Sequence, residues 1–289
     1  MIYGITGNPN KNLLWEPAAE LIGWLLEQDL EFRLHASVAD GLTERGLVAA
    51  SVVEHARIDD LAGRCDLVLS FGGDGTLLNT ARILGSSCTP ILGVNIGRLG
   101  FLTGVEVELV REAIQSIEAG RYEVEKRLTL EAQINGHPEP LRALNEILIT
   151  RTGSAQMISI EVTVDGVFLN RYRSDGIIIA TSTGSTAYSL SAGGPIIAPG
   201  SGVIVVTPVA PHTLTARPVV LPNESQVSVR VMTPGVSYTV AADGEGPTLD
   251  RTGIAVTVSK SKDGVRLVKL EGRDYFDTLR KKLAWGAGG

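Results

Sequence analysis

An apolar run that ends in a glycine-rich acidic loop constrains the fold of this chain more than any other segment. Residues 67–76 read Leu-Val-Leu-Ser-Phe-Gly-Gly-Asp-Gly-Thr, and a helical pattern follows directly over residues 77–84. A buried strand, a tight turn and a helix in this order are typical of an α/β sheet. Glycines let the backbone approach a ligand, and N–H groups at a helix start bind phosphate. Asp74 is unusual in such a loop, because a carboxylate repels phosphate unless it takes a proton, holds a metal or accepts a hydrogen bond from a hydroxyl.

Two interpretations of Asp74 follow from this pattern. In the first, the loop transfers a phosphoryl group to an alcohol, and Asp74 orients or deprotonates the hydroxyl. In the second, the loop is only a tight turn, with Asp74 as the helix N-cap. The sequence has neither a lysine-bearing phosphate loop nor a Gly-x-Gly-x-x-Gly motif after a strand, the fingerprints of common nucleotide sites. A divalent metal ion is therefore expected to supply the charge that a loop lysine supplies elsewhere.

Strands and helices alternate along the first part of the chain. Expected strands are residues 2–6, 31–35, 65–71 and 90–95, and expected helices are 15–28, a short turn at 59–63, and 107–119. Such alternation predicts a mostly parallel sheet with helices on both faces. Ligands of these sheets bind outside the carboxyl ends of the strands, where residues 72–76 and 95–101 are expected.

The second part of the chain is rich in expected strands, at residues 128–134, 158–164, 167–173, 176–180, 203–207, 227–232 and 254–258. Asp165-Gly166 and Asp263-Gly264 are predicted hairpin turns. Residues 274–285 have a helical pattern. We therefore predict a Rossmann-like α/β domain over residues 1–123, a β-sandwich domain over 124–270, and a C-terminal helix, within 271–289, that packs back on the first domain.

Composition and charge narrow the classes of function. The chain has 289 residues, a formal net charge of −6 and two cysteines. The negative charge argues against nucleic-acid binding and against a basic membrane-binding surface. No apolar stretch approaches the length of about 18 residues that predicts a membrane span, and no signal segment is recognised, so we expect a cytoplasmic protein. The sequence shows no Ser/His/Asp triad and no His or Cys spacing suited to a metal ion held by protein ligands alone.

Polar side chains follow apolar strands at two further places. Asn145 and Glu146 form an amide–carboxylate pair that suits a ribose diol or an adenine edge, or else a polar turn. Asp175 is either an acceptor for a ligand or part of an Asp-Gly turn. Arg173 beside it either meets a phosphate or pairs with Asp175.

A segment of hydroxyl residues and glycines spans residues 181–195 and reads Thr-Ser-Thr-Gly-Ser-Thr-Ala-Tyr-Ser-Leu-Ser-Ala-Gly-Gly-Pro. It directly follows an apolar strand, and a flexible linker would be less apolar at its borders. The segment offers amides and hydroxyls to an anionic ligand, with Tyr188 available to stack on a ring. We therefore favour a ligand-binding role.

Together these motifs resemble the NAD kinase family, which transfers phosphate to the adenosine ribose 2′-hydroxyl of NAD to make NADP. The matching motifs come in the family's order: residues 72–76, 95–101, Asn145-Glu146, 174–176, 183–195, 211–214 and Asp243-Gly244, with residues 275–285 similar to the family's closing segment. The Gly-Gly-Asp-Gly loop alone is shared with lipid kinases and phosphofructokinases.

The resemblance implies roles for individual residues. Asp74 would be the catalytic base near the 2′-hydroxyl, and Gly72, Gly73 and Gly75 would shape the phosphate loop. Further ligand contacts are implied for Phe101, Asn145, Glu146, Gln156, Arg173, Asp175, Thr186, Ala187, Tyr188, Ser189, Leu190, Ser191, Ala210 and Glu245. Ser182, Gln156 and Glu245 differ from the residues that the family commonly has there.

The resemblance also implies partners and leaves alternatives open. It implies NAD and ATP, or polyphosphate, as substrates, Mg²⁺ or another divalent ion as cofactor, and a homodimer or homotetramer. A lipid kinase with the same loop would need an apolar acceptor groove, and a phosphofructokinase would need several arginines near the site. A non-catalytic dinucleotide sensor would bind NAD without turnover.

Overall fold

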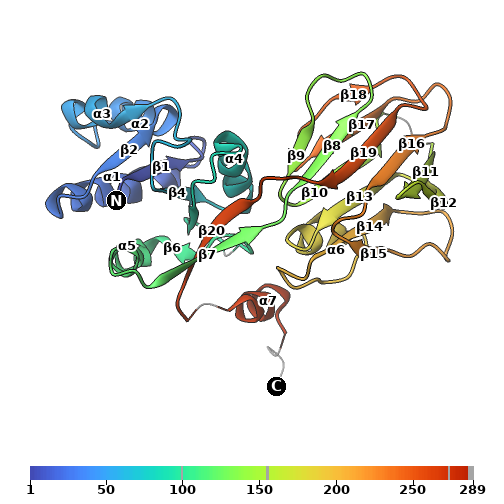
Figure 1. Cartoon of the computed structure of the whole chain (residues 1–289). Coiled ribbons are helices and arrows are strands. Elements are labelled where there is room, and N and C mark those ends of the chain that lie inside the picture. The colour runs from blue at the N-terminus through green and yellow to red at the C-terminus, as the bar shows by residue number, and fades with distance from the viewer. Residues whose placement is uncertain (99, 154–155, 273, 286–289) are drawn as a thin grey trace. The chain divides into compact units, whose positions relative to one another are not determined.

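The computed structural model describes residues 1–98, 100–153, 156–272 and 274–285, and its chain forms two compact units (Figure 1). The first unit comprises Met1–Lys126 and Val265–Gly289, and the second comprises Arg127–Gly264. The chain therefore leaves the first unit once and returns to it near its C-terminus. No helix among the described residues is long and apolar enough to cross a membrane.

The first unit is built on a sheet with the strand order β3-β2-β1-β4-β5-β20-β7, in which β6 also pairs with β5. The strands are β1 (Tyr3–Gly7), β2 (Phe32–His35), β3 (Arg57–Ile58), β4 (Leu67–Gly72), β5 (Ile91–Asn95), β6 (Val105–Glu106), β7 (Tyr122–Arg127) and β20 (Val265–Leu270). Strands β1, β4 and β5 are parallel neighbours. Gly7 lies opposite Phe71, and Gly72 opposite Asn95, so these three strands end at one edge of the sheet.

Chain order along this sheet reverses direction between β1 and β4, since β2 lies beyond β1 and β5 beyond β4. Ligands of open α/β sheets bind in the crevice outside the carboxyl ends of the strands at such a switch point. The glycine-rich loop follows β4, and the loop after β1 lies next to it.

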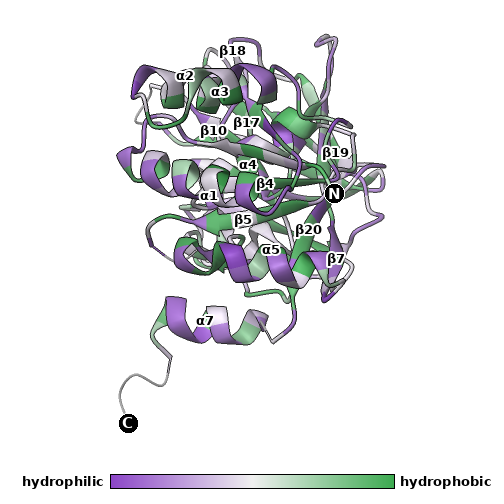
Figure 2. Ribbon diagram, turned by 90° about the vertical axis from the view of Figure 1, so that its left-hand side faces the viewer, coloured by the Kyte–Doolittle hydropathy of each residue, from purple (hydrophilic) through white to green (hydrophobic). Residues whose placement is uncertain are grey.

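The first unit also contains helices, most of which bury one apolar face. They are α1 (Trp15–Glu27), α2 (Ala36–Glu44), α3 (Ala50–Ala56), α4 (Asp74–Leu84), α5 (Val110–Glu118) and α7 (Tyr275–Leu283), with 3-10 turns η1 (Asn12–Leu14) and η2 (Val107–Leu109). In α1, Leu21, Ile22 and Leu25 are fully or almost fully buried, a spacing that places them on one face. Figure 2 shows the matching alternation of hydrophilic and hydrophobic residues along α1 and α5.

Two helices of the first unit, α2 and α3, were absent from the sequence prediction, and one predicted helical turn is wrong. The predicted turn of helix at residues 59–63 is not helical, whereas α2 and α3 precede it. Gly41 lies inside α2, where a Cβ atom would come within 2.1 Å of the Trp15 ring. The glycine weakens the local helix signal, and it is required by a contact with another helix that the sequence pattern does not reveal.

The second unit contains two six-stranded antiparallel sheets, with orders β15-β14-β13-β10-β17-β18 and β12-β11-β16-β19-β8-β9. Its strands are β8 (Leu130–Ile134), β9 (Leu141–Ala143), β10 (Glu146–Arg151), β11 (Ile158–Val164), β12 (Val167–Ser174), β13 (Gly176–Thr181), β14 (Val203–Val209), β15 (Val219–Pro222), β16 (Val227–Val231), β17 (Tyr238–Ala242), β18 (Thr248–Leu249) and β19 (Ala255–Lys260), and it also holds η3 (Gly184–Thr186) and α6 (Tyr188–Ser191). Ile147 and Ile177 of one sheet share a core cluster with Val229 and Val256 of the other. This common core confirms the predicted β-sandwich.

One predicted hairpin is confirmed and the other is wrong. Asp165 and Gly166 have φ angles of 50° and 80° and join the antiparallel strands β11 and β12. Asp263-Gly264 joins no hairpin, because β19 pairs with β16 and β8. The following strand, β20, pairs with β5 in parallel in the first unit. An Asp-Gly pair favours a turn locally, but the pairing of the flanking strands is decided by distant segments.

The C-terminal helix α7 belongs to the first unit. Asp274 caps its start by accepting a hydrogen bond from the Phe276 amide at 3.0 Å. Lys282, in its last turn, lies with Nζ 5.6 Å from the centre of the Phe101 ring. The helix therefore contacts the loop that follows β5.

Candidate active site

The glycine-rich loop turns the chain from β4 into α4. Gly72 ends β4, Gly73 is the N-cap of α4, and Asp74 is the first helical residue. The sequence alternative in which Asp74 caps the helix is therefore wrong. A Cβ atom on Gly72 would lie 2.1 Å from Thr76 Oγ1, whereas one on Gly75 would meet no atom within 4 Å. Gly72 is needed for the turn itself, and Gly75 leaves open space beside the first turn of α4. The leading amides of a helix generally lack an intrahelical partner, although the Thr76 amide here donates to Gly73 O at 3.0 Å.

The Asp74 carboxylate is held by the loop that follows β5. Its Oδ2 accepts a hydrogen bond from the Phe101 amide at 2.8 Å, and its Oδ1 accepts one from the Leu102 amide at 2.9 Å. A Cβ atom on Gly100 would lie 2.0 Å from Asp74 Oδ1. Each oxygen keeps a second acceptor site, so the carboxylate is oriented and can still accept a hydrogen bond from a hydroxyl. The sequence marked residues 95–101 as part of the site, but it did not show this contact.

A lysine from the neighbouring loop lies beside the glycines. Lys11 follows β1 and precedes η1, where its amide donates to Asn8 O at 3.0 Å and its carbonyl accepts from the Leu14 amide at 3.0 Å. Its Nζ lies 3.9 Å from the position that a Cβ atom on Gly73 would take. The sequence motifs did not point to Lys11, because it lies far from the glycine-rich loop in sequence. The feature that could have identified Lys11 is its position in the loop after β1, the strand that pairs with β4.

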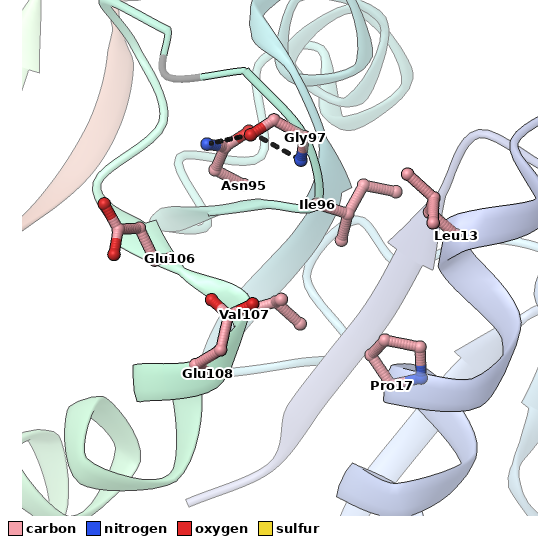
Figure 3. A pocket seen from close by; sticks show the side chains of 8 residues that line it. All are labelled: Leu13, Pro17, Asn95, Ile96, Gly97, Glu106, Val107 and Glu108. Carbon is pink, nitrogen blue, oxygen red and sulfur yellow. Dashed lines mark hydrogen bonds between the residues drawn. The ribbon is translucent and has the colours of Figure 1, made fainter.

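A small pocket lies beside the end of β5 (Figure 3). It is lined by Leu13, Pro17, Asn95, Ile96, Gly97, Glu106, Val107 and Glu108. The Asn95 amide group donates to Gly97 O at 3.1 Å and accepts from the Gly97 amide at 3.2 Å, which fixes the turn after β5. Two glutamates and several apolar side chains make this pocket unsuited to phosphate.

In the second unit, Asn145 and Glu146 lie at the start of β10, next to Asp243. Asp243 Oδ1 accepts hydrogen bonds from the amides of Asn145 and Glu146 at 2.9 and 3.0 Å. Burial, and then the charge of Asp243, raises the pKa of Glu146 to about 7. Within the described part of the chain, the buried Glu146 Oε2 has no hydrogen-bond partner. Such an atom is costly unless a ligand donates to it.

The segment over residues 181–195 folds into η3 and the single turn α6. Ser189 is fully buried and its Oγ shares a hydrogen bond with Thr207 Oγ1 at 3.0 Å. Tyr188 is 43% exposed, whereas Thr186, Ala187 and Leu190 are partly buried and Ser191 is exposed. Tyr188 is therefore accessible and could stack on a ring. The Ser189 hydroxyl is buried, and its hydrogen bond to Thr207 serves the fold.

Asp175 has a different partner from the one suggested by the sequence. Arg151 Nε lies 2.7 Å from Asp175 Oδ1, in a partly exposed ion pair. The alternative in which Arg173 pairs with Asp175 is therefore wrong. The Arg173 carbonyl accepts from the His212 amide at 2.8 Å, close to Ala210, which has a φ of 44°. Gln156 and Glu245 are exposed.

Models of known families match both units of this chain. The ATP-NAD kinase N-terminal domain matches residues 3–122, and the ATP-NAD kinase C-terminal domain matches residues 144–270. The chain belongs to the NAD kinase family. The family confirms the resemblance drawn from the sequence motifs, and with it the prediction of an enzyme of the NAD kinase type.

Full-length relatives and solved structures agree with this assignment. The NAD kinase of Chlorobium phaeobacteroides (strain BS1) is 40% identical over 99% of this chain and 98% of its own. That of Cupriavidus pinatubonensis is 40% identical over 93% of this chain and 87% of its own. A yeast NADH kinase complexed with NADH has a TM-score of 0.87 at 25% identity, covering 100% of this chain and 89% of its own. An Archaeoglobus fulgidus NAD kinase complexed with ATP has a TM-score of 0.73 at 27% identity, covering 98% and 99%.

The raised pKa of Glu146, which lies next to Asp243, predicts that the stability of this NAD kinase family member depends on pH. Because the pKa of Glu146 is raised from 4.5 to about 7 by folding, the folded protein binds a proton more tightly there than the unfolded chain. This contribution to stability is present at low pH and is lost as pH rises through about 7, and a shift of this size corresponds to roughly 3 kcal/mol.

The variant Glu146→Gln keeps the shape of the side chain and cannot ionise. Its midpoint of thermal unfolding should therefore exceed that of the wild type at about pH 8 and approach it at about pH 4. Thermal scans across this range check the expectation. The same difference at both pH values would contradict it.

Proposed function

We propose that this enzyme transfers the terminal phosphate of ATP, or of another donor such as polyphosphate, to the adenosine ribose 2′-hydroxyl of NAD. The proposal rests on the geometry of Asp74. Two loop amides orient its carboxylate at the N-terminus of α4. The solved relatives support the two substrates, since one holds NADH and another holds ATP.

Asp74 would act on the acceptor hydroxyl. A ribose hydroxyl is a poor nucleophile, and holding it in line with the phosphate can lower the barrier by about 7–11 kcal/mol. The hydroxyl proton would pass to Asp74 while the new O–P bond forms and the bond to the leaving phosphate breaks. Such general-base help adds typically ~10²–10⁴-fold to the rate. The Phe101 and Leu102 amides leave an acceptor site on each Asp74 oxygen for this contact.

The donor phosphates would lie against Gly73 and Gly75, with Lys11 supplying positive charge. Its ammonium group is near Gly73, so the lysine that the loop motif lacks is contributed by the loop after β1. Lys11 would share with the expected divalent metal ion the positive charge that the loop motif itself lacks. No group of three or more His, Cys, Asp or Glu side chains in the described part of the chain could hold a metal ion. Mg²⁺ typically binds through one or two carboxylates together with substrate phosphates, and Asp74 with a bound donor fits that pattern.

Removing the charge of Lys11 should weaken donor use selectively. In Lys11→Met we expect KM for ATP to rise about tenfold, the size of one charge-assisted hydrogen bond, with KM for NAD little changed. Lys11→Arg should keep most of the affinity for ATP, because it keeps the charge. Lys126→Met, in the distant edge strand β7, is the matched control and should behave as the wild type. An unchanged KM for ATP in Lys11→Met would contradict the role of Lys11.

NAD would be recognised mainly by residues of the second unit. We propose contacts from Asn145 and Glu146 to a ribose or the adenine, and stacking by Tyr188 on a base. The buried, unpartnered Oε2 of Glu146 supports an acceptor role there. We also propose the remaining ligand contacts that the family resemblance implies. They come from Phe101, Gln156, Arg173, Asp175, Ala210, Glu245 and the α6 segment. We also propose a cytoplasmic homodimer or homotetramer, supported by the family resemblance.

The test is NADP formation from NAD with ATP and Mg²⁺, with polyphosphate as donor, and NADH or a lipid as acceptor, in parallel reactions. NADP that forms with ATP would support the proposal, and the parallel reactions would define the donor and acceptor range. Tight NAD binding without NADP from any donor would support a dinucleotide sensor instead. Phosphorylated lipid would support a lipid kinase.

A further inference from the structure

Asp243 binds three consecutive backbone amides of a segment that lies almost a hundred residues earlier in the chain. Its Oδ2 accepts from the Leu144 amide at 2.7 Å, and its Oδ1 accepts from Asn145 and Glu146 at 2.9 and 3.0 Å. The Asp243 amide in turn donates to Glu146 O at 3.1 Å. Successive N–H groups that converge on one anion form a concave binding site for it. The carboxylate is thus an internal ligand for the backbone of residues 144–146.

The turn that carries Asp243 does not itself require a carboxylate. Asp243 and Gly244 have φ angles of 48° and 92°. Reciprocal hydrogen bonds of 2.8 and 3.1 Å between Ala242 and Glu245 close the turn after β17. This is a two-residue hairpin turn in which Asn-Gly is at least as favourable as Asp-Gly. Burial raises the pKa of Asp243, and the three amide hydrogen bonds oppose that effect. The negative charge is therefore explained by the amides rather than by the turn.

The same segment is held from its other side by Thr181 and Gly184. Thr181 Oγ1 donates to Leu144 O at 2.7 Å, and its amide donates to Asn145 O at 2.8 Å. A Cβ atom on Gly184 would lie 2.1 Å from Asn145 O, so only glycine permits this approach. With the backbone fixed on both sides, the Asn145 and Glu146 side chains are presented from a rigid base. Rigid presentation lowers the entropic cost of binding a ligand.

We propose that Asp243 is a positioning residue for NAD, which it serves by locking the backbone of residues 144–146 so that Asn145 and Glu146 face the dinucleotide in one arrangement. This inference rests on the proposed function, since it assumes that these two side chains bind NAD. It assigns Asp243 no contact with the donor. Loss of the Asp243 carboxylate should therefore weaken NAD binding and leave ATP binding intact.

Two variants and a matched control test the proposal. Asp243→Asn keeps the turn and one acceptor oxygen but turns an NH₂ group toward one of the three amides. We expect it to raise both KM and Kd for NAD about tenfold, the size expected for one lost hydrogen bond to a charged group, with KM for ATP unchanged. Asp243→Ala should raise them further. Asp165→Asn, in the other Asp-Gly hairpin turn of the second unit, should behave as the wild type.

Direct calorimetry of NAD binding and the thermal midpoint of each variant complete the test. A folded Asp243→Asn variant with wild-type Kd for NAD would overturn the proposal. An equal rise in KM for NAD and ATP that tracks the loss of thermal stability would also overturn it, because it would indicate a purely structural role. Failure of the wild-type chain to form NADP, with NAD binding still weakened in Asp243→Asn, would overturn the proposed function and leave this inference standing.

Discussion

Replacing Asp74 by asparagine is expected to lower kcat by ~10²–10⁴-fold, the range for loss of a general base. The amide is nearly the same size and cannot take the hydroxyl proton. One of the two loop amides will also face an NH₂ group instead of an oxygen. Because the proposed NAD contacts lie mainly on other residues, Kd for NAD should change little. Steady-state kinetics and calorimetry measure the two quantities separately.

Asp66→Asn is the matched control for this variant. Asp66 lies just before β4 and its Oδ2 accepts a hydrogen bond from the Ile2 amide at 2.7 Å, so it is also an aspartate bound to backbone. Its replacement should leave kcat unchanged. Wild-type turnover in Asp74→Asn would exclude Asp74 as the base and leave positioning and charge as the sources of catalysis.

Adding a single methyl group at Gly100 is expected to have an effect of similar size. The Cβ atom of Gly100→Ala would lie 2.0 Å from Asp74 Oδ1 and 2.8 Å from Thr103 Oγ1, so the carboxylate must move. A displacement of about 1 Å at a reacting group can cost roughly 10²-fold in rate. We therefore expect kcat to fall by about that factor while the protein stays folded.

Gly97→Ala supplies the control in the same loop, because a Cβ atom there would meet nothing within 4 Å. It should keep wild-type kcat. The double variant Asp74→Asn/Gly100→Ala should be little slower than Asp74→Asn alone, since both changes act through one carboxylate. Additive losses in the double variant, or wild-type kcat in Gly100→Ala, would show that Gly100 does not act through Asp74.

Local patterns predicted the elements whose signal is contained in a short window. The apolar run before Gly72, the α1 face and the Asp165-Gly166 turn each follow from the spacing of a few neighbouring residues. The errors arose where a distant contact decides the outcome. The strand after Asp263-Gly264 pairs with β5 in the first unit, and α2 carries a glycine in its interior because a tryptophan ring packs against it.

For the candidate site, the sequence by itself determined the residue types, the glycine-rich loop and the order of motifs that match the NAD kinase family. Only the tertiary structure decided which groups meet. It brings Lys11 beside Gly73, the Phe101 and Leu102 amides onto Asp74, and the Asp243 carboxylate onto the amides of residues 144–146. The physical reason is that a motif records short-range backbone preferences, whereas hydrogen bonds and charge contacts between loops depend on the order and register of strands that are far apart in the chain.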